Sequence, residues 1–175
     1  MIINILKRKF PILHFSYWIF KKIGFGTLIL NYIAKIARKN SNYKFSLHYT
    51  SQISFPERLE YENDITTIVS FAVSGNCYFQ ANNGIKLGKN CLIAPGVKII
   101  SSNHDFITKN IVLNKSILIG SNVWIGTNVV ILPGVVIGNN VTIGAGSVVT
   151  KSFDRDNLVI AGNPARIIKD MNEKK

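Results

Sequence analysis

The second half of the chain is built on a repeat of six residues. From residue 119 the sequence divides into IGSNVW, IGTNVV, ILPGVV, IGNNVT and IGAGSV, and each block opens with isoleucine. Three earlier blocks, LGKNCL, IAPGVK and IISSNH, open at residues 87, 93 and 99 and are offset by two from the later set. A short fixed repeat is typical of a solenoid, in which each unit buries its apolar face only by stacking on its neighbours.

The composition of the six-residue block predicts how the chain turns. We expect the aliphatic first residue and the compact fifth residue to point inward, while glycine and asparagine at positions two to four supply the turns. Three blocks would then form one triangular coil of short parallel strands, because neither helical spacing nor hairpin signals are present. The fifth positions are Cys91, Val97, Val123, Val129, Val135, Val141 and Ser147, with polar Asn103 as the exception.

The two cysteines predict neither a metal site nor a disulfide. Cys77 and Cys91 lie fourteen residues apart, without a CxxC pair or a nearby histidine. Zinc sites and disulfide frameworks need denser or differently spaced ligands. We therefore expect no metal and two buried, reduced thiols in a chain whose 175 residues suit one domain.

The net charge of +12 is concentrated toward the N-terminus, where residues 1–60 hold ten basic and two acidic groups. The apolar blocks there are too short for a spanning helix, and charges recurring after each block do not suit a secretory signal, so we expect a cytoplasmic chain. A nucleic-acid-binding pattern of basic and aromatic residues is missing. Two interpretations of an amphipathic helix over residues 27–39 stay open. It lies on the anionic inner face of a membrane, giving peripheral contact through residues 1–45, or it packs on protein.

The repeats and the closing VIAGNPARIIK resemble the hexapeptide-repeat acyltransferases over roughly residues 65–169. The similarity is to the branch of maltose, galactoside and polysaccharide O-acetyltransferases. It implies an all-β solenoid, a left-handed parallel β-helix, usually a homotrimer with active sites between subunits. We expect a basic, helical N-terminal segment over residues 1–50, a β-helix over 51–165 with an extruded loop over 105–116, and a C-terminal tail over 166–175.

His104 is the predicted general base, because a sugar hydroxyl needs a proton acceptor before it attacks a thioester and imidazole titrates close to neutral pH. It is the histidine of the repeat region, at the end of IISSNH. The family places its catalytic histidine at this position, before the loop. Asp105 is the candidate that orients the imidazole, and a backbone carbonyl is the alternative.

Acetyl-CoA is the acyl donor that the resemblance implies. Its phosphates favour cations and backbone N–H groups near the end of the β-helix. Trp124 matches a family tryptophan that lies beside the reacting centre. The alternative for Trp124 is an aromatic residue at a subunit interface. The matching cofactor positions are Trp124, Thr127, Ala145, Thr150, Lys151, Arg166 and Lys169.

The acceptor is predicted with less guidance. Asn76, Asn82 and Asn83 are candidates for binding sugar hydroxyls, although asparagine also suits coil turns. Ser74 and Asn82 stand where some sugar-acetylating relatives carry an asparagine and an acidic residue. These departures weaken the assignment to small sugars.

The sequence favours one function over three others. We expect O-acetylation of a bacterial surface polysaccharide or its lipid-linked precursor, since the cationic N-terminal segment suits a membrane-bound acceptor. A soluble acetyltransferase for a free sugar, an amino-sugar nucleotide, serine or a drug is the alternative, serine being weaker because the long N-terminal domain of that branch is missing. A zinc carbonic anhydrase needs three histidine ligands, and a non-catalytic module leaves His104 and PARIIK unexplained.

Overall fold

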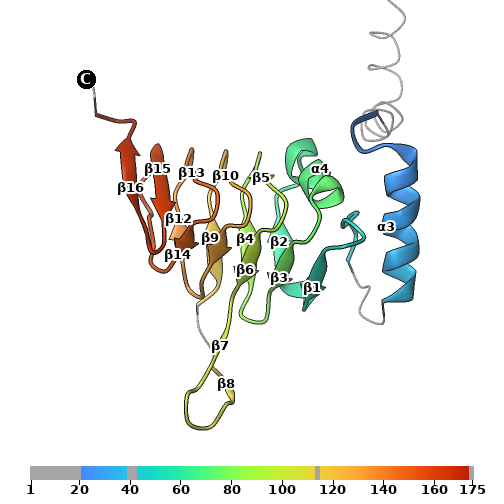
Figure 1. The fold of residues 1–175 in the computed structure, drawn as a ribbon, viewed down its shortest axis with the longest axis horizontal. Coiled ribbons are helices and arrows are strands. Elements are labelled where there is room, and N and C mark those ends of the chain that lie inside the picture. The colour runs from blue at the N-terminus through green and yellow to red at the C-terminus, as the bar shows by residue number, and fades with distance from the viewer. Residues whose placement is uncertain (1–20, 39–42, 113–114, 174–175) are drawn as a thin grey trace, which may run out of the picture.

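The computed structural model describes residues 21–38, 43–112 and 115–173, and it shows a parallel β-helix (Figure 1). Three sheets form the sides of the coil. Sheet A has the strand order β1-β3-β6-β11-β14, sheet B has β12-β9-β4-β2, and sheet C has β16-β15-β13-β10-β5. The pairs within these sheets are parallel except β15 with β16, so each turn of the coil stacks on the one before it.

The strands are short because each side of the coil holds only two or three extended residues. Sheet A contains β1 (Gln52–Ser54), β3 (Tyr78–Gln80), β6 (Lys98–Ile100), β11 (Val130–Ile131) and β14 (Val148–Val149). Sheet B contains β2 (Leu59–Tyr61), β4 (Ile85–Leu87), β9 (Ile117–Ile119) and β12 (Val136–Ile137). Sheet C contains β5 (Leu92–Ile93), β10 (Trp124–Ile125), β13 (Thr142–Ile143), β15 (Leu158–Gly162) and β16 (Ala165–Asp170). A 3-10 turn, η1 (Pro56–Arg58), precedes β2.

The predicted inward positions are buried. The first isoleucines of the five later blocks are at most 3% exposed, and the seven compact fifth residues are at most 1% exposed except Val135 at 2%. The fourth residue of each of these blocks has a positive φ, as predicted for asparagine and glycine at the turns. One apolar column, filled from every coil, is therefore the core of the protein.

Asparagines at the corner between sheets B and C form a ladder along the coil axis. The side-chain amide of Asn122 donates to Asn140 at 3.0 Å, Asn140 donates to Asn157 at 3.1 Å, and Asn90 donates to Asn122 at 3.2 Å. These asparagines have φ between 55° and 61°. Asparagine thus serves twice at this corner, since it adopts the left-handed turn and links neighbouring coils.

Helix α4 (Ile65–Val73) occupies the place of a strand beside β5, a substitution that the repeat does not predict. Its hydroxyl side chains supply the hydrogen bonds that a strand would make. Thr67 Oγ1 accepts from Cys91 N at 3.0 Å, Ser70 Oγ accepts from Ile93 N at 3.2 Å, and Ser74 Oγ, just past the helix, donates to Ile93 O at 2.6 Å. Backbone N–H and C=O groups at the open edge of sheet C therefore have hydrogen-bond partners without another coil.

Two predicted boundaries need correction. Residues 166–170 of the predicted tail are not a tail, because β16 (Ala165–Asp170) pairs antiparallel with β15 and extends sheet C. The extruded loop begins at Asn103 rather than at 105, because residue 103 already lies in a hairpin of β7 (Asn103–His104) and β8 (Ile111–Val112). In the N-terminal segment, α3 (Phe25–Ala37) lies across the end of the coil, while residues 1–20 and 39–42 lie outside the described residues.

The two thiols are free and buried, as predicted. Burial raises the pKa of the Cys91 thiol to about 11 from an ordinary value of 9.0, and raises that of Cys77 as well. At pH 8 we expect Cys91 of the native chain to react with a thiol reagent at least about a hundredfold more slowly than in denaturant, and Cys77 to be slowed as well, since the thiolate is the reactive form. The raised pKa also means that folding loses stability as pH rises from 9 toward 11, because the unfolded thiol ionises first. Absorbance from released thionitrobenzoate measures the reaction, and equal rates would contradict the burial.

Candidate active site

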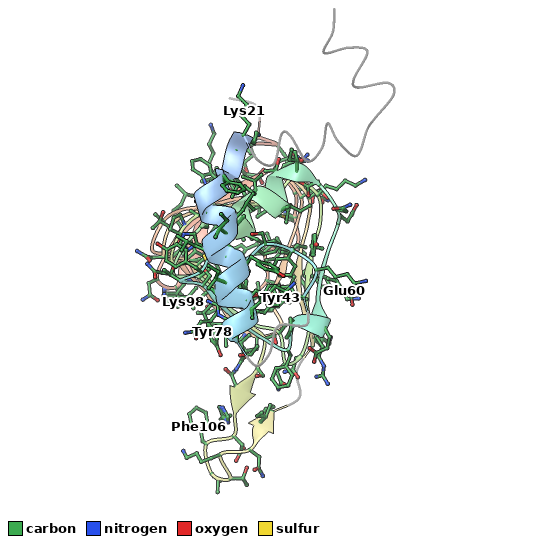
Figure 2. The ribbon with its side chains drawn as sticks, turned by 90° about the vertical axis from the view of Figure 1, so that its right-hand side faces the viewer. Lys21, Tyr43, Glu60, Tyr78, Lys98 and Phe106 are labelled. Atoms are coloured by element: carbon green, nitrogen blue, oxygen red, sulfur yellow. The ribbon has the colours of Figure 1, made fainter. Side chains whose placement is uncertain are left out.

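His104 lies on β7, where the chain leaves the coil at the corner between sheets A and B. Paired residues in sheet C are separated by 32 positions across this coil, as with Ile93 and Ile125, but by 18 in the next coil, as with Ile125 and Ile143. The extra residues form the β7–β8 hairpin, which projects from the side of the solenoid (Figure 1). Phe106 marks its tip in Figure 2 and is 91% exposed.

The imidazole of His104 is oriented by a backbone carbonyl. Its Nδ1 lies 2.8 Å from the carbonyl oxygen of Lys109. A carbonyl only accepts, so Nδ1 carries the proton and Nε2 of the neutral ring has a free lone pair. The ring is exposed, so this lone pair faces a region that a substrate can reach. This geometry suits a general base.

Asp105 does not orient the imidazole, so the first of the two alternatives is wrong. Its Oδ1 accepts from Ile107 N at 3.0 Å, Thr108 N at 2.7 Å and Thr108 Oγ1 at 3.0 Å. These bonds lower the pKa of the Asp105 carboxyl, the backbone N–H of Thr108 having the largest effect. Asp105 instead shapes the tip of the hairpin, and its carbonyl accepts from Lys109 N at 3.0 Å, which helps to hold the peptide that contacts His104.

The base of the hairpin is held by polar side chains on β3 and in the turn that follows it. Gln80 Oε1 accepts from the backbone and hydroxyl of Ser102 at 3.0 and 2.9 Å, immediately before the strand of His104. Asn83 Nδ2 donates to the carbonyls of Ser101 at 2.9 Å and Val112 at 3.1 Å, so one side chain joins both sides of the hairpin. These contacts fix the point where His104 leaves the coil.

Two of the three predicted acceptor asparagines lie at the corner of His104. Asn82 and Asn83 line an open hollow of about 410 Å³ together with Glu57, Arg58, Glu60, Gly84, Lys86 and Ser116. Asn76 is elsewhere, because it occupies a left-handed turn between sheets C and A and its N–H donates to Thr50 Oγ1 at 2.8 Å. Asn76 therefore has a structural role at another corner.

Ser74 and Asn82, the two positions that depart from sugar-acetylating relatives, are both buried. The Ser74 hydroxyl donates to Ile93 O at 2.6 Å and its carbonyl accepts from Ser51 Oγ at 2.8 Å. The Asn82 carbonyl accepts from the guanidinium of Arg58. Ser74 is thus committed to the connection between α4 and sheet C.

The predicted cofactor residues fall into three groups on the surface. Thr150 and Lys151 follow β14 and share the corner of His104. Thr127 and Ala145 are exposed at the corner between sheets C and A, where Gly146 N donates to Thr127 O at 2.8 Å. The remaining three, Trp124, Arg166 and Lys169, lie on strands β10 and β16 of sheet C.

The cations of these groups are available to an anion. The salt bridges among the described residues join Lys86 to Glu60, Lys89 to Glu62 and Arg155 to Asp170. Lys151 instead lies over the ring of Phe153, with Nζ 5.7 Å from the centroid, and Arg166 Nη1 donates to the carbonyl of Ala165 at 3.1 Å. Among the described residues, no carboxylate forms a salt bridge with Lys151, Arg166 or Lys169. Their positive charges are therefore free to bind a phosphate.

The sequence offered a backbone carbonyl as one partner of His104 without indicating which residue supplies it, and it gave no sign of a role for Gln80. The Lys109 carbonyl is a backbone atom, present in every residue, and its position depends on a left-handed turn at φ 58°. Gln80 lies in the preceding coil, twenty-two residues before Ser102, and the register that brings them together is visible only in the folded coil. Among the described residues, no group of three or more histidine, cysteine or acidic side chains is arranged to hold a metal ion.

Residues 116–151 match the family described as "Bacterial transferase hexapeptide (six repeats)". A Dictyostelium discoideum protein named "Putative acetyltransferase" is 41% identical over 121 residues, which are 67% of this chain, and the chain spans only 63% of that relative's length. A maltose O-acetyltransferase from Clostridium difficile 630 is 27% identical, with 89% of each chain covered and a TM-score of 0.52.

Two further solved structures share the fold. A galactoside acetyltransferase in complex with coenzyme A is 27% identical, with 88% of this chain and 82% of that chain covered and a TM-score of 0.51. A hexapeptide-repeat acetyltransferase from Vibrio cholerae is 19% identical, with 85% and 88% covered and a TM-score of 0.58. With its six-residue blocks wound into the three sheets of one coil, the chain carries the hexapeptide repeat of the bacterial transferases and folds as a left-handed parallel β-helix.

Proposed function

We propose that this protein is an acetyl-CoA-dependent O-acetyltransferase in which His104 is the general base. The observation that carries the proposal is the 2.8 Å contact between His104 Nδ1 and the Lys109 carbonyl, which leaves Nε2 as the proton acceptor. The similarity to maltose and galactoside acetyltransferases at 27% identity supports the same class of reaction.

The proposed reaction requires one proton carrier. His104 Nε2 takes the proton of an acceptor hydroxyl while that oxygen bonds to the thioester carbonyl carbon. When the carbon–sulfur bond breaks, the imidazolium returns the proton to the departing sulfur, so an ester and a free thiol are formed. The Lys109 carbonyl stabilises the imidazolium between these steps, since it accepts from Nδ1 in both states.

The donor would be held by the exposed residues of the three surface groups. Lys151, Arg166 and Lys169 supply positive charge for phosphates, and the small Ala145 and Thr127 leave backbone accessible at their corner. Trp124, 54% exposed on β10, would flank the acyl end, and Thr150 adjoins Lys151. The coenzyme A in the galactoside acetyltransferase complex supports this choice of donor.

A complete site would combine two copies of the chain. His104 lies at the corner between sheets A and B, whereas Thr127 and Ala145 lie at the corner between sheets C and A. Sheet A separates these corners within one chain. A trimer with its solenoids side by side would bring the His104 corner of one subunit to the Thr127 corner of the next, as the family resemblance implies.

For the acceptor, we propose a sugar hydroxyl of a bacterial surface polysaccharide or its lipid-linked precursor. The buried, structurally committed Ser74 argues against the small-sugar contacts of relatives, and the open hollow beside Asn82 and Asn83 leaves room for a longer chain. The second candidate is a free small sugar, which the similarity to maltose and galactoside acetyltransferases favours.

Release of the coenzyme A thiol from acetyl-CoA tests the proposal. We expect at least about tenfold higher kcat/KM with polysaccharide repeat units or their lipid-linked forms than with maltose or a galactoside, because a longer acceptor fills more of the hollow. Mass spectrometry of the product, with an added acetyl group on oxygen, separates transfer from thioester hydrolysis. Faster transfer to the free sugars would favour the second candidate, and no transfer to any hydroxyl would overturn the proposed reaction.

A further inference from the structure

Helix α3 is attached to the protein by its polar side. Asn31 is 3% exposed, and its Nδ2 donates to Ala72 O and Ser46 Oγ, both at 3.0 Å. Its Oδ1 accepts from Tyr49 N at 2.9 Å. Because both N–H groups and the oxygen of this buried amide are hydrogen-bonded, Asn31 fixes which side of the helix faces the rest of the protein. Lys35, on the same side, donates to the carbonyl of Tyr43.

The opposite side of α3 is apolar and exposed. Ile29, Ile33 and Ile36 are 42%, 56% and 66% exposed, and Tyr32 beside them is 65% exposed. The spacing of i, i+4 and i+7 places the three isoleucines in one stripe. A helix that packs on a protein core normally turns such a stripe inward. In α3 the arrangement is reversed, so the stripe is placed to meet something outside this chain.

The charged residues of the N-terminal segment that contains α3 are all of one sign. The sequence contains no aspartate or glutamate before Glu57. Lys21 and Lys22 are exposed at the approach to the helix, and Arg38 follows its end. An exposed apolar stripe flanked only by cations fits an anionic lipid surface, whereas a protein partner would also have to neutralise every cation with its own acids.

The position of α3 leaves the catalytic features accessible. The helix crosses the N-terminal end of the solenoid, as the end-on view in Figure 2 shows, and strand β16 lies at the other end (Figure 1). The hairpin that carries His104 projects from the side. No helix in the described parts of the chain has the length and apolarity to span a bilayer. Contact at this end would therefore be peripheral.

We propose that α3 docks the protein on an anionic membrane surface, with Ile29, Tyr32, Ile33 and Ile36 entering the interface and Lys21 and Lys22 meeting lipid headgroups. The proposed binding partner of this face of α3 is a lipid bilayer. The proposal does not depend on the acetyl-transfer reaction, since it rests on the helix alone. It places the protein where a lipid-linked sugar would be found.

Flotation of the full chain with vesicles tests this docking. Vesicles of phosphatidylcholine mixed with phosphatidylglycerol are expected to bind at least about tenfold more strongly than phosphatidylcholine alone, with added salt weakening the binding. The triple variant Ile29→Gln, Ile33→Gln, Ile36→Gln should reduce binding at least about tenfold, since glutamine keeps the helix but removes the apolar surface. The triple leucine variant should retain binding.

Two controls separate docking from other effects. The matched variant Ile167→Gln, Ile168→Gln, Met171→Gln removes residues 45%, 65% and 48% exposed at the far end of the solenoid and should leave vesicle binding unchanged. Lys21→Gln with Lys22→Gln should weaken binding to the anionic vesicles only. Equal binding to both vesicle types, or no loss in the α3 triple glutamine variant, would overturn the proposal. A smaller oligomer for that variant without lipid would assign the face to a second copy instead.

Discussion

Replacing His104 with alanine is expected to lower kcat/KM for acetyl transfer by about 10²–10⁴-fold, the range that a lost general base produces. The reason is local. Nε2 is the lone pair left free by the bond from Nδ1 to the Lys109 carbonyl, and alanine offers no proton acceptor in its place. The side chain is exposed, so its removal should leave the unfolding temperature nearly unchanged. Release of the coenzyme A thiol measures the rate, and circular dichroism measures stability.

His48→Ala is the matched control for this variant. His48 is the other histidine in the described residues, and it lies at the N-terminal end of the coil, with Nδ1 2.9 Å from Thr50 Oγ1 and its ring stacked on Tyr49. Burial lowers the pKa of His48, but nothing in its surroundings connects it with the hairpin. Its loss should leave kcat/KM within about twofold. Full activity in His104→Ala would show that another group accepts the proton.

The repeat predicted the coil and its core because the same physical demand recurs in every block. A small inward residue at position five, such as Val129 or Val141, and a turn residue at position four can be recognised without knowing which strands pair. The asparagine ladder follows from the same positions, but it depends on the distance between stacked coils. That distance is a property of the fold and not of one block.

The ends of the solenoid were less predictable for the same reason. Helix α4 replaces a strand by presenting hydroxyls from Thr67 and Ser70, two residues that in sequence resemble any polar helix positions. Strand β16 lies outside the six-residue pattern altogether, because it pairs antiparallel with β15. Helix α4 and strand β16 each cover one of the two edges of sheet C, where the stack of coils ends. Each element occurs once in the chain, so no repeated pattern reveals it.

In the site, the histidine could be predicted and its partner could not. His104 stands out as a titratable residue at the end of a block, which is a sequence property. Its partner is the carbonyl of Lys109, selected by a tight turn that Asp105 shapes through Ile107 and Thr108. A carboxylate next to a histidine in sequence suggested a direct contact. The hairpin uses the carboxylate for its backbone instead.

Excising residues 103–116 with Ser102→Gly is expected to abolish acetyl transfer while keeping a folded β-helix. The coil of His104 is 14 residues longer than the next one, as the separations of 32 and 18 between paired isoleucines show. Removal of that length places Ile117, which is fully buried, at the fifth position of the block that opens at Ile99. Glycine at 102 supplies the left-handed fourth position that the other blocks have.

The excised chain should lose the contacts of Asn83 with Val112 and Ser116, both at the base of the hairpin, and keep every contact of the apolar column. We therefore expect its unfolding temperature to fall by no more than a few degrees, while kcat/KM falls to background because His104 and its carbonyl partner are gone. Excising one residue more, 103–117, is the control. It removes the inward Ile117 and moves the following residues to the wrong side of the coil, so that chain should not fold. If both excised chains unfold alike, the hairpin is required for folding and is not an insertion in a self-sufficient coil.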